Sequence, residues 1–487
     1  MVSGIDGMAA RRQPLCGLHS SDTLAAMGRQ RTMPKGAINR LNPHAVAAGL
    51  AAAISLVVTG AAAQQSQGMI WCANKGEAFS SDLVINGCTV IIDSNKERPR
   101  TLALAFNNRG LAYAERGDLD RALADYSAAI RLDPGLALAF NNRALAKVER
   151  RDIEGAIMDF GEAIRLDPKF TLAFTARGNA YFDQKDYDRA LADYSEAIRI
   201  DPTAAIAFHN RGLAWRDKGD LDRAVADYSE AIRIDRMYRD AYQNRAFAFR
   251  KKGDFDHALA DLNAAIRLDP KSVAALGSRG SLFEEKGDFV GALADLDQAV
   301  AIQPANAENR NLRGHVYYSM GNLDGALAEF GEALRLDPTS AAALANRGLA
   351  YETRGEYARA VLDFEEATKL APGNFDYWNS RCWARAVAGR ELQEALMDCN
   401  ESLRLAPNRA DALDSRGFVH LKLGDLAKAL ADYDAALRLN PRFVSSLYGR
   451  SVARQRKGDR AGASADLAAA KAIRPTIADE FAIYGIK

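Results

Sequence analysis

Arginine and carboxylate side chains recur together through most of the chain. Arg109 is followed sixteen residues later by Asp125, and Arg211 is followed in the same way by Asp227. The arginines of the series are Arg109, Arg143, Arg177, Arg211, Arg245, Arg279, Arg313, Arg347, Arg381, Arg416 and Arg450. The carboxylates are Asp125, Asp159, Asp193, Asp227, Asp261, Asp295, Glu329, Asp363, Asp398, Asp432 and Asp466. A guanidinium that faces a carboxylate forms charge-assisted hydrogen bonds. The two series predict an ion-pair ladder, within one repeat or between neighbouring repeats.

Such a ladder can hold a structure together or bind a ligand. A ligand-binding residue is expected only in the repeats that the ligand touches, whereas Arg109 has an equivalent in every repeat. Partly buried ion pairs fix the register of neighbouring elements. We therefore favour the structural role, with ligand binding as the alternative.

The remaining chemistry-bearing residues do not form a recognisable active site. His209, His257, His315 and His420 are scattered along the chain, and neither H-E-x-x-H nor a Cys/His metal spacing occurs. Walker, dinucleotide-binding and G-x-S-x-G motifs are also missing from the sequence. We expect no catalytic residues, no metal site and no cofactor, and therefore no enzyme.

Composition excludes one further class of function. The 487 residues are 48% apolar and 26% charged, with a formal net charge of +1. Nucleic-acid binding depends on a surplus of Lys and Arg, which this balance lacks. Nucleic acid is therefore not an expected partner.

The chain begins with a predicted leader. Residues 45–63 form an uncharged apolar run that ends in an A-x-A site, which predicts a signal peptide cleaved after Ala63. The alternative is an uncleaved anchor in the inner membrane, for which the run is just long enough. Met33 is the better start for a signal, in which case residues 1–32 are never translated. The expected location is the periplasm or another exported compartment.

From residue 101 onward the chain repeats with a period of 34 residues. The prolines that mark the period are Pro134, Pro168, Pro202, Pro270, Pro304, Pro338 and Pro372, and after one inserted residue Pro407, Pro441 and Pro475. Within the first repeat, Gly117 suits a helix end and Asp118 suits the start of the next helix. This pattern predicts a solenoid of antiparallel helix pairs.

Small residues occupy two further columns of the repeat. The equivalents of Ala122 are alanine throughout, and the equivalents of Gly110 are all small. Two helices approach closely only where neither carries a large side chain. These columns, with the period, resemble tetratricopeptide repeats of the exported bacterial type with "NRG" motifs, over residues 101–475. The resemblance implies an all-α, right-handed superhelical solenoid of about eleven helix pairs.

The resemblance also implies a protein or peptide partner, bound by the first helix of each pair on a concave surface. The column expected to face that groove is Leu111, Leu145, Asn179, Leu213, Phe247, Ser281, His315, Leu349, Trp383, Phe418 and Val452. An apolar strip of this kind suits one side of a partner helix or an extended segment. Trp383 and Phe418 are the expected hot spots, because large aromatic residues contribute most energy. The alternative is that some of these residues pack against the neighbouring repeat.

Four cysteines follow the leader. Cys382 and Cys399 take the places of Gly110 and Tyr126, which face each other in an antiparallel hairpin, so the two thiols should meet and could bond. Cys72 and Cys88 would then form a second disulfide. An even number of cysteines suits an exported protein. The alternative is four inert buried thiols in a reducing compartment.

Two short segments flank the repeats. Residues 64–100 contain a helix-like run, "SDLVINGCTVIIDS", that is expected to cap the first repeat. Residues 476–487 place Ile477, Phe481 and Tyr484 on one helical face, which predicts a C-terminal capping helix. The leading functional hypothesis is a non-catalytic interaction scaffold of the bacterial cell envelope. The alternative is a regulatory or substrate-presenting subunit of an envelope enzyme or secretion complex.

Overall fold

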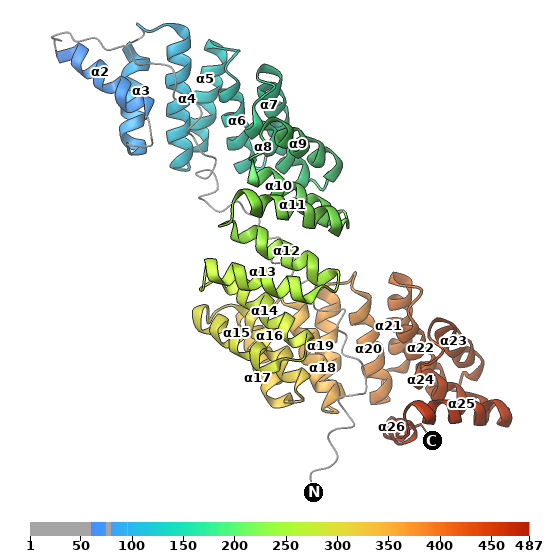
Figure 1. Ribbon diagram of the computed structural model, residues 1–487. Helices are drawn as coiled ribbons and strands as arrows, with labels where there is room; N and C mark the ends of the chain where they lie inside the picture. The colour runs from blue at the N-terminus through green and yellow to red at the C-terminus, as the bar shows by residue number, and fades with distance from the viewer. Residues whose placement is uncertain (1–59, 75–78, 95, 487) are drawn as a thin grey trace. The chain divides into compact units, whose positions relative to one another are not determined.

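The computed structural model describes residues 60–74, 79–94 and 96–486, and every regular element in them is a helix (Figure 1). These residues fall into two compact units, an N-terminal unit that ends at Pro270 and a C-terminal unit that begins at Lys271. Each unit is a row of helix pairs in which consecutive helices pack together. The all-α fold of paired helices predicted from the sequence is confirmed, and its handedness stays a prediction.

The N-terminal unit contains helices α2 to α13. Their bounds are α2 Gly60–Ala73, α3 Ser81–Ser94, α4 Pro99–Glu115, α5 Leu119–Leu132, α6 Ala137–Glu149, α7 Ile153–Leu166, α8 Thr171–Asp183, α9 Tyr187–Ile200, α10 Ala205–Asp217, α11 Leu221–Ile234, α12 Arg239–Lys251 and α13 Phe255–Leu268. Even-numbered helices are the first helices of the hairpins, and odd-numbered helices are the second.

The C-terminal unit contains helices α14 to α26. Their bounds are α14 Val273–Glu285, α15 Phe289–Ile302, α16 Ala307–Ser319, α17 Leu323–Leu336, α18 Ala341–Thr353, α19 Tyr357–Leu370, α20 Phe375–Ala388, α21 Leu392–Leu405, α22 Ala410–Leu423, α23 Leu426–Leu439, α24 Val444–Arg456, α25 Arg460–Ile473 and α26 Ile477–Ile483. The same numbering of first and second helices applies up to α25.

The break between the two helices of a hairpin follows from a few residues. In the first repeat, Gly117 has a φ of 79°, a left-handed conformation that glycine adopts without steric cost. The Asp118 side chain then accepts a hydrogen bond from the Arg121 backbone N–H at 3.2 Å and caps α5. Arg151 and Lys185 hold the same left-handed position in the next two hairpins without being glycine.

Close approach of the two helices explains the small-residue columns. A Cβ added to Gly110 would lie 2.8 Å from the Tyr126 ring, closer than such contacts allow. Ala122 and Tyr126 of α5 are buried, and Tyr113 of α4 packs against them. In an antiparallel hairpin a residue late in the first helix faces one early in the second, and these contacts follow that order. Each hairpin therefore packs through a small residue on one helix and a large one on the other.

The predicted leader lies outside the described residues except for residues 60–63. Those residues are the first turn of α2, and the cleavage site predicted after Ala63 stays a prediction. No helix in the described ranges combines the length and the apolar character needed to cross a membrane. The helix-like run expected before the repeats is α3, Ser81–Ser94, which packs against both α2 and α4.

Candidate binding surface

The ladder residues meet within each hairpin. Arg109 donates from Nε to Asp125 Oδ2 at 2.8 Å and from Nη2 to Asp125 Oδ1 at 2.9 Å, a two-bond fork. The same fork joins Arg143–Asp159, Arg177–Asp193, Arg211–Asp227, Arg245–Asp261, Arg279–Asp295, Arg347–Asp363, Arg381–Asp398, Arg416–Asp432 and Arg450–Asp466. Arg313 makes a single bond to Glu329 at 2.7 Å. The hydrogen bond that Arg109 donates to Asp125 raises the pKa of Arg109, which therefore stays charged.

The arginine also contacts the preceding hairpin in most repeats. Arg211 donates from Nη1 to Ser195 Oγ at 3.1 Å, two residues after the carboxylate of the preceding pair. The equivalent contacts are Arg143 to Ser127, Arg245 to Ser229, Arg313 to Asp297, Arg416 to Asn400 and Arg450 to Asp434. A single guanidinium thus connects both helices of its own hairpin to the hairpin before it.

In three repeats a second basic side chain contacts the ladder carboxylate. These repeats have Lys147, Arg385 or Arg454 at the position that Tyr113 occupies in the first repeat. Lys147 Nζ lies 2.8 Å from Asp159 Oδ2, and Arg385 Nη1 lies 2.6 Å from Asp398 Oδ2. Arg454 contacts Asp466 in the same way at 2.9 Å. These contacts were not predicted from the sequence. The positive charge of these side chains, four residues after the ladder arginine, is the signal that predicts the contact.

Both cysteine pairs lie at bonding distance. The Sγ atoms of Cys72 and Cys88 are 2.07 Å apart, and those of Cys382 and Cys399 are 1.96 Å apart. The first pair joins α2 to α3 and the second joins α20 to α21. All four side chains are buried.

The hairpin α2–α3 resembles a further repeat that the sequence search missed. Arg109 donates to Thr89 Oγ1 on α3 at 3.1 Å, as Arg143 donates to Ser127 on α5. Cys72 and Cys88 are sixteen positions apart in the sequence, as Gly110 and Tyr126 are. This shared separation is the signal that could have revealed the additional repeat.

The first helices of neighbouring hairpins in the N-terminal unit are connected by polar side chains. Asn142 Nδ2 donates to Asn107 Oδ1 at 3.0 Å, and Asn210 Nδ2 donates to Asn179 Oδ1 at 2.9 Å. Asn244 Nδ2 lies 3.0 Å from His209 Nε2. Each of these side chains lies one or two residues before its ladder arginine, or two residues after it. Positions three or four residues apart lie on the same side of a helix, so these positions share one side. We call the surface that these positions form the first-helix face.

Family models for tetratricopeptide repeats match the chain at several places. One described as "TPR repeat" matches residues 178–215, 212–253 and 314–354, and three described as "Tetratricopeptide repeat" match 103–136, 244–307, and 341–374 with 410–443. Together these matches cover more than half of the chain. The chain belongs to the tetratricopeptide repeat (TPR) family. A search of curated proteins finds no match.

Several solved TPR structures are similar in fold. A tetratricopeptide repeat protein from Parabacteroides merdae ATCC 43184 is 18% identical, with a TM-score of 0.42, covering 51% of this chain and 98% of that one. A chain of the APC/C hetero-tetramer Cut9–Hcn1 is 15% identical, with a TM-score of 0.47, covering 87% and 88%. YrrB, "a TPR protein with an unusual peptide-binding site", is 24% identical, with a TM-score of 0.30, covering 37% and 92%.

The predicted groove column differs in exposure along the TPR array. Leu111 is 38% exposed. Leu145, Asn179, Phe247, His315 and Leu349 are half-buried. Leu213, Ser281, Trp383, Phe418 and Val452 are buried. For these five buried residues, the structure favours the alternative that the column packs against neighbouring parts of the array.

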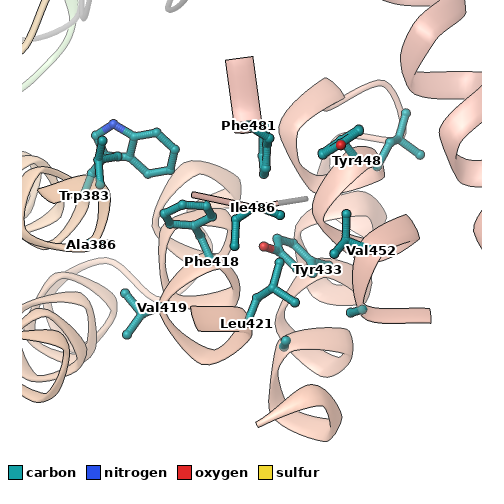
Figure 2. Close-up of a cluster of buried hydrophobic side chains, with 14 of the residues drawn as sticks. Trp383, Ala386, Phe418, Val419, Leu421, Tyr433, Tyr448, Val452, Phe481 and Ile486 are labelled. Atoms are coloured by element: carbon teal, nitrogen blue, oxygen red, sulfur yellow. The ribbon is translucent and has the colours of Figure 1, made fainter. Parts of the chain in front are cut away.

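Trp383 and Phe418, the two predicted hot spots, are not exposed in the structure, and their role in binding stays a prediction. Phe418 is 1% exposed and Trp383 is 8% exposed. The reason is the C-terminal segment, in which Phe481 of α26 and Tyr484 just after it pack on these rings. Figure 2 shows Phe481 and Ile486 among Phe418, Tyr433 and Tyr448.

The four histidines of the TPR array contact different partners. His209 Nδ1 lies 3.0 Å from the Tyr238 hydroxyl, and His315 Nδ1 lies 2.5 Å from Glu284 Oε1. His257 contacts Asp254 at the start of its own helix, and burial lowers the pKa of His420. Within the described residues no group of three or more His, Cys, Asp or Glu side chains is placed to hold a metal ion.

Proposed function

We propose that this TPR protein is a non-catalytic scaffold that binds a segment of a partner protein on the first-helix face of its N-terminal unit. TPR proteins bind protein or peptide partners, and the fold supplies a row of parallel first helices for that purpose. The observation that carries the proposal is a contrast between two columns. The ladder keeps an arginine and a carboxylate in each of the eleven repeats, whereas the column of Leu111, Asn179 and Phe247 changes from one repeat to the next. A surface that reads a particular partner has to vary in this way.

Exposure and polarity on this face suit a segment with one apolar side. Leu111 is exposed and Leu145 is half-buried, so apolar surface is available to a partner. The asparagine side chains between successive first helices offer amide groups beside that apolar surface. A partner segment can therefore bury apolar side chains and exchange hydrogen bonds at the same site.

We further propose that the scaffold works in an exported compartment. The two cysteine pairs at bonding distance support this, because structural disulfides persist in oxidising compartments and are rare in the cytosol. The predicted leader points the same way. Alkylating the protein in intact cells, before and after reduction, tests the compartment. We expect Cys72, Cys88, Cys382 and Cys399 to resist alkylation until the protein is reduced and unfolded, and four free thiols would contradict the proposal.

Site-specific photo-crosslinking in cells tests the binding surface. We expect a photoreactive residue at Leu111 or Leu145 to form an adduct with another protein. The matched control is Met158, which is 73% exposed on the second helix α7 and lies off the first-helix face. Equal adducts from Met158, or adducts only with further copies of this chain, would contradict the proposal.

A further inference from the structure

Helix α26 lies across several hairpins of the C-terminal unit. Its Tyr484 meets the Trp383 ring of α20 edge-on, with ring centroids 5.6 Å apart. Its Phe481 packs on Phe418 of α22 at 5.7 Å and on Tyr448 of α24 at 4.6 Å. The C-terminal segment thus contacts three successive first helices, as Figure 2 shows for Phe481, Phe418 and Tyr448.

The side chains that α26 covers belong to the first-helix face. Trp383 and Phe418 each lie two residues after a ladder arginine, as Leu111 does in the N-terminal unit. Tyr448 lies two residues before its arginine, as Asn107 does. On α20, α22 and α24 these side chains of the face are buried, because the chain supplies its own occupant there.

The contact has the character of a bound amphipathic helix. Phe481 lies on α26, Tyr484 and Ile486 follow the end of the helix, and Phe481 and Ile486 are each 2% exposed. Glu480 accepts hydrogen bonds from Arg474 at 3.1 Å and from the Thr476 hydroxyl at 3.0 Å. Peptide helices commonly bind in this way, by burying aromatic side chains in a groove between the helices of a partner protein.

We propose that the first-helix face of α20, α22 and α24 is a binding site for a short helix with aromatic residues three apart, and that residues 476–487 fill it as an internal competitor. This rests on the proposed function, since it assigns the same kind of face in the other unit. A partner helix of like chemistry binds there only when the tail leaves. Tethering gives the tail an effective concentration of about a millimolar, so a tail with an intrinsic Kd of about ten micromolar weakens a competing helix by roughly a hundred-fold.

The first experiment uses a labelled peptide with the sequence of residues 476–487. Its binding is measured by fluorescence anisotropy to the full chain and to a chain that ends at Pro475, with helix content checked for both. We expect saturable binding to the shortened chain and binding weaker by about a hundred-fold to the full chain. A peptide carrying Phe481→Ala and Tyr484→Ala is the matched control and should not bind. A folded shortened chain that ignores the peptide would overturn the proposal.

A second variant covers the case in which the shortened chain fails to fold. A protease site inserted between Arg474 and Thr476 allows the tail to be cut after folding. We expect the cut tail to exchange with excess labelled peptide. A cut tail that stays bound without exchange is part of the core, and that result would overturn the proposal.

The outcome is separable from that of the scaffold proposal. Adducts at Leu111 and Leu145 report on the N-terminal unit and do not involve the tail. Failure of peptide binding with those adducts intact removes only the internal competitor.

Discussion

The ladder carboxylates are buried, and a buried carboxylate is stable only when its charge is matched. Asp227 is 5% exposed and receives both bonds of the Arg211 fork. Removing one partner leaves the other charge buried and unpaired, whereas replacing both by apolar residues can be nearly neutral. The pair therefore constrains the register of the hairpin more than it adds net stability.

The first prediction concerns this asymmetry. We expect Arg211→Ala to lower the free energy of unfolding by roughly 3 kcal/mol, because Asp227 is left without its counter-charge. The double variant Arg211→Met with Asp227→Leu should recover most of that loss. Urea unfolding of the single and double variants measures the difference, and a single variant as stable as the parent would contradict the ladder's structural role.

A second prediction concerns a buried amide on α16. Asn309 is 1% exposed, and neither amide atom of its side chain has a hydrogen-bond partner among the described residues. The equivalent residues in other repeats are mostly alanine, such as Ala275 and Ala343. We expect Asn309→Ala to stabilise the protein by about 1 kcal/mol, because an unpaired buried polar group is costly.

Asn311 on the same helix is the matched control for that change. It accepts a hydrogen bond from Asn346 Nδ2 at 3.0 Å. Asn311→Ala should therefore destabilise the protein in the same thermal unfolding assay. Stabilisation by both substitutions, or by neither, would show that the missing hydrogen bonds are not the cause.

Glu308 makes stability depend on pH. Burial raises the pKa of Glu308 from 4.5 to about 7. The folded chain then holds a proton that the unfolded chain loses between those values, so stability falls as pH rises from about 4.5 to 7 and levels off above. We expect Glu308→Gln to match the parent near pH 4 and to exceed it at pH 8 in unfolding midpoint. A constant difference at the two pH values would contradict this assignment.

At the scale of helices, the hairpin break decides where one element ends and the next begins. Most breaks place glycine in the left-handed conformation, as Gly219 does with a φ of 89°. Lys185 holds a φ of 61° at the equivalent position and carries a Cβ that this conformation disfavours. The turn between α8 and α9 is therefore strained, and a glycine at this position would relieve the strain.

The prediction at this scale is that Lys185→Gly stabilises the protein by about 1 kcal/mol, since it relieves a left-handed non-glycine residue. Gly219→Ala is the matched control and should destabilise by a similar amount. Denaturant unfolding of both variants measures the effect. A loss of stability in Lys185→Gly would contradict the assignment of strain to this turn.

The hairpins were predictable because their determinants are local and repeated. Gly110 with Tyr126 and Cys382 with Cys399 occupy the same two positions of the repeat once the one inserted residue is counted, so the repeat pattern predicts both contacts. The hairpin α2–α3 was missed because Trp71 stands where the ladder arginine would be, and Gly87 where the aspartate would be. A Cβ on Gly87 would lie 2.7 Å from Trp71 Cβ, so this substituted pair also packs closely.

The place of α26 could not be predicted in the same way. The sequence indicated a helix with Ile477, Phe481 and Tyr484 on one side, whereas α26 ends at Ile483 and carries only the first two of them. Which surface it covers depends on contacts with Trp383 and Phe418, which are far away in the sequence and carry no spacing rule. Because this contact depends on the tertiary structure, the burial of Trp383 and Phe418 could not be predicted from the sequence.

At the scale of the whole molecule, each hairpin mainly contacts its neighbours in its own unit. Stability in such an array is close to a sum of local terms, so a change in one hairpin acts locally. We therefore propose that structure and recognition are separable in this chain: the ladder holds the hairpins together, and the variable positions of the first-helix face meet the partner. That separation is the central claim.

The most direct test measures stability and partner binding on the same two variants. With a photoreactive residue at Leu145, the yield of partner adduct and the unfolding temperature are compared for Arg211→Ala and Leu111→Asp. We expect Arg211→Ala to unfold at a lower temperature while keeping its adduct, and Leu111→Asp to lose the adduct at an unchanged unfolding temperature. Loss of the adduct in Arg211→Ala with no change in unfolding temperature would make the ladder a binding site and contradict the account.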